Sequence, residues 1–211
     1  MLKIKIFPFN PFQVNTYVLY DETGDCAIID AACYGNHEEI QLKSFIEENN
    51  LKPVLLLNTH CHIDHILGNN FVSQTWGLKP MTQKDCISFL ENAVEYGQTF
   101  GFDVKKPVMP DKYLTENQVV VFGNQELKVL EAPGHADGSV CFYHEKENLV
   151  IAGDVLFQNS IGRTDLPTGD FDKLINSIQT KLMVLPDNTV VHCGHGPATT
   201  IGEEKRNNPF L

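Results

Sequence analysis

Short apolar runs separated by polar turns occupy the first thirty residues, which is the pattern of β-strands that bury one face. Three such runs cover residues 2–7, 14–20 and 26–30. The segments FNPFQ and DETGD separate them, and Gly24 in the second segment suits a hairpin turn. The chain therefore begins with three predicted strands.

The spacing of apolar residues changes after residue 36. Leu42, Phe45 and Ile46 recur at near-helical spacing, which predicts a helix that ends before Pro53. A short aliphatic run at residues 53–57 predicts a buried strand directly after this helix. The chain thus passes from strands to a helix and back to a strand within its first quarter.

A second helix is predicted at residues 81–97. Thr82 and Asp85 form a capping-box pattern at its start, and Gly97 can end it. The second half of the chain predicts one more helix at about residues 171–183 and strands at residues 118–122, 127–131, 139–143, 149–152 and 189–193. Blocks of strands with intervening helices favour an α/β fold in which two sheets lie between helical layers.

Composition limits the class of protein. No linker or repeat divides residues 1–211, and 42% of them are apolar, so we expect a single domain. Acidic residues outnumber basic ones by 27 to 16, which argues against nucleic acid as a partner. The longest aliphatic run, residues 54–57, is far shorter than the about 20 residues that span a bilayer, so no membrane association is expected. The six cysteines form no CxxC motif, which favours free thiols and a cytoplasmic location.

The segment THCHIDH places three imidazoles and a carboxylate directly after the buried strand, and it is the strongest chemical signal in the chain. In an extended loop His60 and His62 point to the same side, while Asp64 and His65 turn toward a second position. The segment therefore predicts a site for two metal ions. Nitrogen and oxygen ligands suit zinc, iron or manganese, and zinc is the preferred interpretation.

Two metal ions need more ligands than this one segment supplies. His135, Asp154 and His195 each follow a glycine at the end of a predicted strand. Taken alone, a His or Asp at a strand end more often caps the strand or supports another side chain. Their shared position relative to the THCHIDH segment favours convergence on one metal centre instead.

The motifs THCHIDH, PGHADGS, AGDVLF and GHGP occur in this order, and together they resemble the metallo-β-lactamase superfamily, in particular its short, single-domain glyoxalase II-like hydrolases. The resemblance implies an αββα sandwich. It also implies one metal ion on His60, His62 and His135, a second on Asp64, His65 and His195, and Asp154 as a bridge between them. β-Lactamases proper typically have a cysteine ligand where this chain has Asp154 and lack the paired Asp-His, so antibiotic hydrolysis is not expected.

The resemblance implies a thioester hydrolase that uses a hydroxide between two metal ions. The expected substrate is a small-molecule hydroxyacyl-thiol conjugate, such as S-lactoylglutathione or the ester of a related small thiol. Asp64 would orient the hydroxide. The segment VLFQNSIGR after Asp154 lacks the Lys and Tyr that full-length glyoxalase II enzymes use for glutathione. Two alternatives stay open: a persulfide dioxygenase with a single iron, and a metal-binding protein without catalytic activity.

Several other residues attract attention for their chemistry or position. Asp30 resembles a residue that holds a metal-bound histidine by its second ring nitrogen. Cys61 should point away from the metal ligands and fill space. Arg163 and Asp165 are predicted to pair and fix their loop. The remaining histidines, which we interpret as surface or structural residues, are His37, His144 and His192. Nothing in the sequence specifies an oligomeric state.

Overall fold

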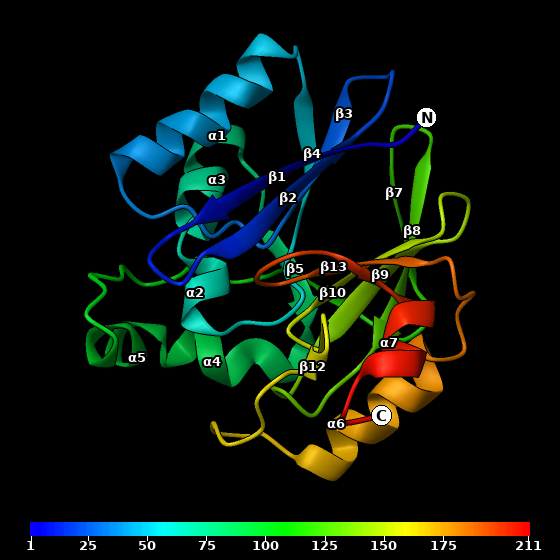
Figure 1. The fold of residues 1–211 in the computed structure, drawn as a ribbon. Coiled ribbons are helices and arrows are strands. Elements are labelled where there is room, and N and C mark those ends of the chain that lie inside the picture. The colour runs from blue at the N-terminus through cyan, green and yellow to red at the C-terminus, as the bar shows by residue number, and fades with distance from the viewer.

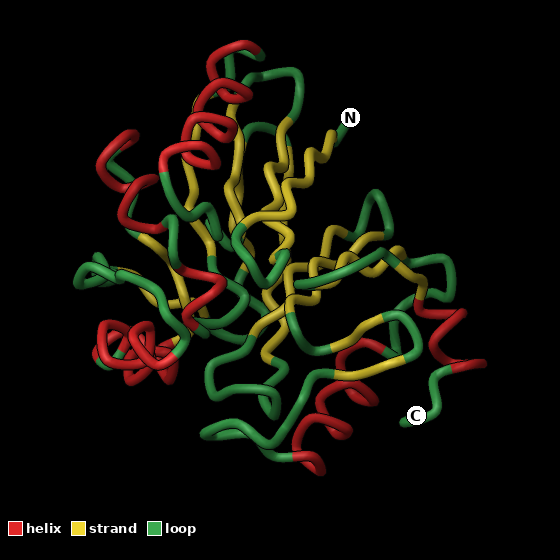
Figure 2. Tube along the Cα trace, turned by 60° about the vertical axis from the view of Figure 1, so that its left-hand side comes forward, coloured by secondary structure: helices red, strands yellow, loops and turns green.

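Two β-sheets face each other, and helices cover the outer face of each (Figures 1 and 2). The computed structural model describes residues 1–211. The fold is the αββα sandwich that the sequence predicts, in a single domain. None of its helices has the length and apolar character required to cross a membrane.

The first sheet contains six strands in chain order. They are β1 (Lys3–Phe9), β2 (Val14–Tyr20), β3 (Asp25–Ile29), β4 (Lys52–Leu57), β5 (Pro80–Gln83) and β6 (Lys112–Leu114). The first three strands pair antiparallel, and β3 to β6 pair parallel. Parallel pairing needs a long crossover, which explains why helices separate β3 from β4 and β4 from β5.

The second sheet has the order β14-β13-β10-β9-β8-β7. Its strands are β7 (Val119–Phe122), β8 (Gln125–Glu131), β9 (Val140–His144), β10 (Leu149–Gly153), β13 (Val190–Cys193) and β14 (Thr199–Thr200). Only β10 and β13 pair parallel. A small ribbon of β11 (Leu156–Phe157) and β12 (Ser160–Ile161) follows β10 and lies beside the end of the sheet where the loops gather.

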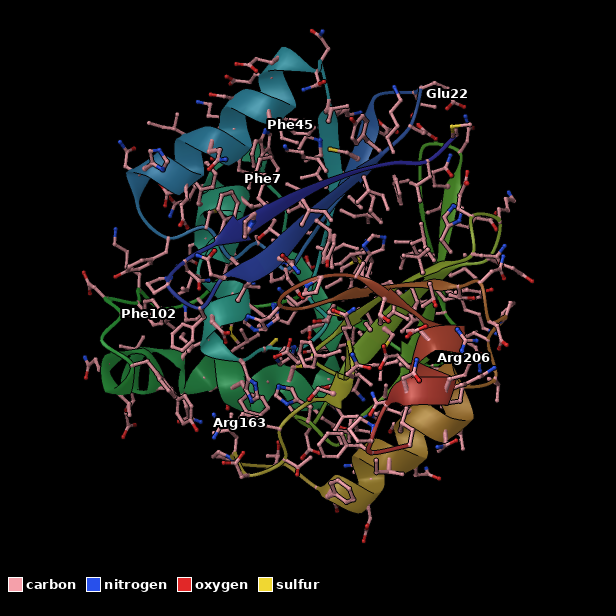
Figure 3. The ribbon with its side chains drawn as sticks, in the orientation of Figure 1. Phe7, Glu22, Phe45, Phe102, Arg163 and Arg206 are labelled. Atoms are coloured by element: carbon pink, nitrogen blue, oxygen red, sulfur yellow. The ribbon has the colours of Figure 1, made fainter.

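Helices form the outer layers. On the first sheet lie α1 (Asn36–Glu48) and α3 (Asn69–Trp76), and on the second lie α6 (Phe171–Ser177), its π-helical extension (Ile178–Leu182) and α7 (Ile201–Asn207). The short helices α2 (Ile63–Ile66), α4 (Ile87–Glu91) and α5 (Ala93–Thr99) pack together at the edge of the sandwich, with a 3-10 turn at Lys84–Cys86. Phe45 of α1 packs edge-on against Phe7 of β1, with ring centroids 5.5 Å apart (Figure 3).

The core between the sheets follows the alternation of side chains along each strand. On β2, Tyr17 and Leu19 face the opposite sheet, while Val18 faces the helices outside. On β8, Leu127 and Val129 are buried in the same inter-sheet core, and Lys128 between them is exposed. This period of two is the pattern that the sequence analysis used, so most of the strands could be recognised from it.

The predicted helix at residues 81–97 is confirmed only in part: residues 81–83 belong to β5, and the 3-10 turn, α4 and α5 follow them. Thr82 lies in β5, which pairs parallel with β4 and β6, and its buried hydroxyl lies 3.4 Å from the Sγ atom of Cys61. The helical part is divided into α4 and α5 at Asn92, whose side chain donates a hydrogen bond to the carbonyl of Ser88. Pairing with two neighbouring strands therefore outweighs the local capping pattern.

The carboxyl ends of β4, β8, β10 and β13 meet at one edge of the sandwich. The backbone N–H of Asn15 in β2 donates to the carbonyl of Gly194 after β13 at 2.7 Å, so the two sheets are joined there. The Asn15 side chain also donates to the carbonyls of Cys193 and Gly196. The loops at this edge are thereby fixed relative to one another, and they carry every metal ligand that the sequence predicts.

Candidate metal centre

Seven side chains converge at this edge from four stretches that are distant in sequence. His60 and His62 lie in the loop after β4, and Asp64 and His65 lie in α2. The other three follow β8, β10 and β13 and are His135, Asp154 and His195. The structure therefore brings together all of the residues that the sequence singles out, in groups of three whose ligand atoms lie within 4.8 Å of one another.

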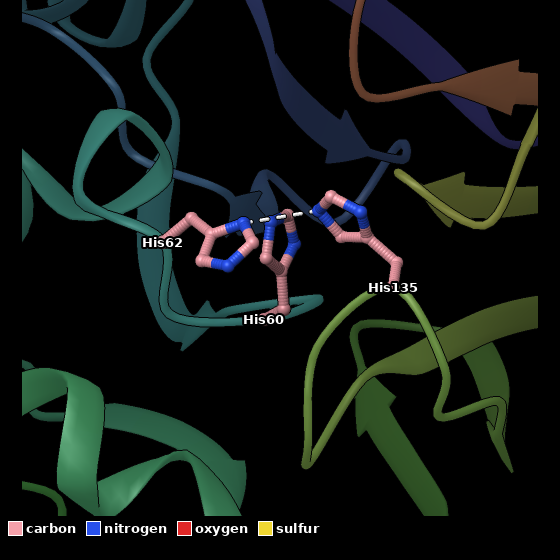
Figure 4. Close-up of side chains that lie close together, drawn as sticks. All are labelled: His60, His62 and His135. Carbon is pink, nitrogen blue, oxygen red and sulfur yellow. Dashed lines mark hydrogen bonds between the residues drawn. The ribbon is translucent and has the colours of Figure 1, made fainter. Parts of the chain in front are cut away.

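The first group consists of His60, His62 and His135. The Nδ1 atom of His62 lies 3.0 Å from the Nε2 atom of His135 (Figure 4). All three side chains are nearly inaccessible to solvent, and the loop that carries His135 approaches from the second sheet. Three imidazole nitrogens on one side of a small space are a donor set that can hold a single metal ion.

The second group consists of Asp64, His65 and His195. The Oδ2 atom of Asp64 lies 3.5 Å from the Nε2 atom of His195 and 3.9 Å from that of His65. Asp154 lies between the two groups: its Oδ1 atom is 3.4 Å from His65, and its Oδ2 atom is 3.6 Å from His135 and 3.4 Å from His195. The two carboxylate oxygens of Asp154 thus lie close to histidines of both ligand groups.

Three buried polar atoms that lack a hydrogen-bond partner show that metal ions fit this centre. The Nε2 atoms of His60 and His65 and the Oδ1 atom of Asp154 are buried and make no hydrogen bond. Such atoms are costly to bury unless a cation or a donor satisfies them. All three face the space between the ligand groups, so the residues present fit a bound metal.

The outward-facing ring nitrogens of two histidines are held by one carboxylate. Asp30 accepts a hydrogen bond from the Nδ1 atom of His65 at 3.0 Å, as the sequence predicts. It also accepts from the hydroxyl of Thr59 at 2.7 Å, and that hydroxyl lies 3.1 Å from the Nδ1 atom of His60. Asp30 therefore aims the Nε2 atoms of both rings at the centre and stabilises their orientation.

Backbone carbonyls hold two further rings, those of His135 and His195, and the sequence carries no signal for these carbonyls. The Nδ1 atom of His135 donates to the carbonyl of Arg163, and that of His195 donates to the carbonyl of Phe12, each at 2.8 Å. Asn10 fixes the loop that carries Phe12, because its side chain donates to the carbonyls of Ala32 and Asp64. Thr59, Asn10 and these two carbonyls are the supporting groups that the sequence analysis missed.

The charges of the centre shift the pKa values of its histidines in opposite directions. Burial lowers the pKa of His60 well below its ordinary value and that of His62 to about 4. Burial also opposes protonation of His65 and His195, but nearby carboxylates, Asp154 foremost, outweigh it and raise the pKa of His65 well above its ordinary value and that of His195 to about 9. In the metal-free protein these two rings therefore keep their protons to higher pH than His60 and His62 do, and a metal ion would have to displace them.

Replacing Asp30 with Asn should weaken metal binding by about 10- to 100-fold, because the loss of the carboxylate releases the orientation of His65 and His60. Titration of the metal-free protein with zinc measures this change. Asp21→Asn is the matched control, since Asp21 is also a buried aspartate and holds a turn at Asn124, outside the metal centre. Equal zinc affinity in Asp30→Asn and the unmodified protein would contradict the assigned role.

A cavity of about 420 Å³ opens over the centre and includes Asp64, Asp154 and His195 in its wall. Its remaining lining is largely apolar and aromatic. Arg163 lies on the loop after β12 (Figure 3), where its guanidinium forms two hydrogen bonds with the carboxylate of Asp165, at 2.7 and 2.6 Å. A small organic molecule can therefore reach the metal centre from this side.

Other residues that the sequence raised lie outside the centre. Cys61 is buried among the short helices at the edge of the sandwich, and all six cysteines are unpaired and buried. His37 is exposed. His144 is buried and bonds to Gln125 at 3.0 Å, and His192 packs edge-on against the ring of Tyr17. These positions agree with structural or surface roles.

Comparison with known proteins agrees with this geometry. The sequence model of the metallo-beta-lactamase superfamily matches residues 9–195. The hydroxyacylglutathione hydrolase GloC of Haemophilus influenzae is 38% identical over 216 residues, which cover 100% of this chain and 98% of GloC. The crystal structure of BLEG-1 B3 metallo-beta-lactamase has a TM-score of 0.90 at 37% identity, with 99% of each chain covered. TTHA1623 in a di-iron-bound form has a TM-score of 0.88 at 34% identity, covering 98% of this chain and 100% of that one. The chain belongs to the metallo-beta-lactamase superfamily.

Proposed function

We propose that this metal-dependent hydrolase binds two metal ions and cleaves thioesters of the hydroxyacyl-thiol type. The observation that carries the proposal is the position of Asp154, whose two oxygens lie 3.4 to 3.6 Å from histidines of both ligand groups. The similarity to GloC, a hydroxyacylglutathione hydrolase, supports a thioester substrate. Zinc is the proposed metal, and iron or manganese would suit the same nitrogen and oxygen ligands.

Each residue has a proposed part in the reaction. One ion would be held by His60, His62 and His135, the other by Asp64, His65 and His195, and Asp154 would contact both. When bound, the metal pair would supply a hydroxide at neutral pH and polarise the carbonyl oxygen of the ester. The leaving thiolate needs less protonation than an amide nitrogen, so the chain does not need a separate acid.

Asp64 is proposed to orient the attacking hydroxide, because its carboxylate lines the cavity as well as facing the second ligand group. Replacing Asp64 with Asn should lower kcat for a thioester by about 100-fold, the order of loss expected when a group that acts on the attacking oxygen is removed. The measurement needs protein in which elemental analysis still finds both metal ions. Full activity under that condition would refute the role.

Metal content and turnover together test the function. We expect two metal ions per chain, hydrolysis of S-lactoylglutathione or of other lactoyl and hydroxyacyl thioesters, and loss of this activity in His60→Ala. A single iron per chain with oxygen uptake on a persulfide would replace the proposal with a dioxygenase. Two bound metals without turnover of any thioester or β-lactam would indicate a metal-binding protein without catalytic activity.

A β-lactam is the second candidate substrate, since BLEG-1, described as a B3 metallo-beta-lactamase, is 37% identical to this chain. Hydrolysis of a β-lactam also requires attack by a metal-bound hydroxide on a carbonyl carbon. Hydrolysis of a cephalosporin should be measured together with hydrolysis of the thioesters. A larger kcat/KM for the cephalosporin than for every thioester would favour this second function.

A further inference from the structure

We propose that the cavity over the metal centre selects thioesters whose thiol half is uncharged and apolar, and disfavours thiols that carry carboxylates. The inference rests on the proposed thioester hydrolase function and narrows its substrate class. It is carried by three features: aromatic walls close to the ligands, a second hollow without lysine or arginine, and the absence of an unpaired lysine or arginine in either space.

Aromatic rings from distant segments form much of the cavity wall. Phe12 lies in the loop after β1, and Phe100 follows α5, yet their rings meet edge to face with centroids 6.1 Å apart. Both rings are 44% exposed, although large aromatic side chains are normally more buried. The carbonyl of Phe12 holds the ring of His195, so this aromatic wall is fixed to the metal centre. An apolar group bound here would cover both rings and remove them from water.

A second hollow of about 410 Å³ lies beside the first on the side of α4 and α5. The two spaces share His62, Ile63 and Tyr96 in their walls, so they meet next to the metal ligands. A thioester has two parts on either side of its carbonyl carbon, and two adjoining spaces can take one part each. Glu95 is the only Asp or Glu in the wall of the second hollow, which contains no Lys or Arg.

Neither space offers an unpaired lysine or arginine to a carboxylate. Arg163 is the only Lys or Arg in the two linings, and its guanidinium is engaged by Asp165 through two hydrogen bonds. A carboxylate on the thiol would therefore lose water without gaining a partner, unless Arg163 left Asp165. Glu95 in the second hollow would repel it further. Glutathione carries two carboxylates, whereas benzyl mercaptan carries none and matches the aromatic wall.

Three lactoyl thioesters with the same acyl group separate charge from size: those of glutathione, glutathione diethyl ester and benzyl mercaptan. We expect kcat/KM to be about 10-fold or more higher for the benzyl ester than for the glutathione ester, within the range by which binding pockets discriminate. The diethyl ester should exceed glutathione itself, because esterification removes both carboxylates. The highest kcat/KM for the glutathione ester would overturn the inference.

Variants test the residues that the inference names. Phe12→Ala and Phe100→Ala should each lower kcat/KM for the benzyl ester by up to about 10-fold and affect the glutathione ester less. Phe171→Ala is the matched control, because Phe171 is 49% exposed and lies outside both spaces. Asp165→Asn frees Arg163 and should shift the ratio of kcat/KM toward the glutathione ester several-fold. The inference would be overturned if the ratio of kcat/KM for the benzyl ester to that for the glutathione ester stayed unchanged in Phe12→Ala, Phe100→Ala and Asp165→Asn.

Binding of thioethers that cannot be hydrolysed separates the cavity preference from the proposed reaction. Calorimetry on the metal-loaded protein should show tighter binding of benzyl methyl sulfide than of S-methylglutathione, by about 10-fold. If no ester is cleaved but this order of affinity holds, the proposed hydrolase function fails while the cavity preference stands. Tighter binding of S-methylglutathione would overturn the preference, whichever ester is cleaved.

Discussion

Replacing Asp154 with Asn should lower kcat/KM for a thioester by about 1000-fold or more and remove at least one metal ion. Loss of a residue that only supports a metal ligand already lowers metal affinity or activity by about 10- to 100-fold. Asp154 is placed to contact metal ions in both ligand groups, so its loss should cost more than that. Asn keeps the shape of the side chain but offers a neutral amide in place of the second carboxylate oxygen.

Loss of the negative charge of Asp154 should add to the loss of metal binding in Asp154→Asn. Its carboxylate is the foremost of the groups that raise the pKa values of His65 and His195, so it attracts positive charge to this place in the metal-free protein. Elemental analysis should find fewer than two metal ions per chain in Asp154→Asn. The control is Asp187→Asn, which removes an exposed carboxylate that pairs with Lys205 far along the second sheet. Two metal ions and full activity in Asp154→Asn would contradict the proposed bridge.

Gly194→Ala should lower activity by about 100-fold without replacing any ligand. A Cβ atom at this position would collide with the Oδ1 atom of Asp154 and lie 2.9 Å from the Cε1 atom of His65. Asp154 cannot yield without moving its oxygens away from the ligand groups, and a displacement of about 1 Å in a catalytic site can cost about 100-fold in rate. The predicted loss of activity therefore comes from the collision of the added methyl group with Asp154, and not from backbone strain.

Metal content, kcat/KM and the melting temperature of Gly194→Ala should be measured together. We expect reduced metal content and activity in a protein that still folds. Gly202→Ala, in α7, is the control, because it adds the same methyl group at a position away from the metal centre, where the nearest atoms belong to Asp187. A Gly194→Ala protein that matches this control in metal content and rate would show that the centre tolerates the added atom.

Local sequence could predict most of the strands and the side chains that gather at the metal centre, but it placed residues 81–83 in a helix. The strands of the sandwich alternate between two faces, and that alternation is visible in the sequence. Thr82 and Asp85 also match a helix start, yet Gln83 supplies the cap: its side chain accepts from the backbone N–H of Asp85. The segment before it pairs with β4 and β6, which are distant in sequence, so only the tertiary structure decides its conformation.

The sequence by itself determined which residues could bind metal, because coordination requires particular side chains. His60, His62 and Asp64 are conspicuous for that reason, and so are ligands that follow a glycine at a strand end. Only the tertiary structure decided how the ligands are held and what surrounds them. The carbonyls of Phe12 and Arg163 orient two rings, and every residue type has a carbonyl, so no sequence pattern marks them. The cavity wall likewise depends on packing between distant segments.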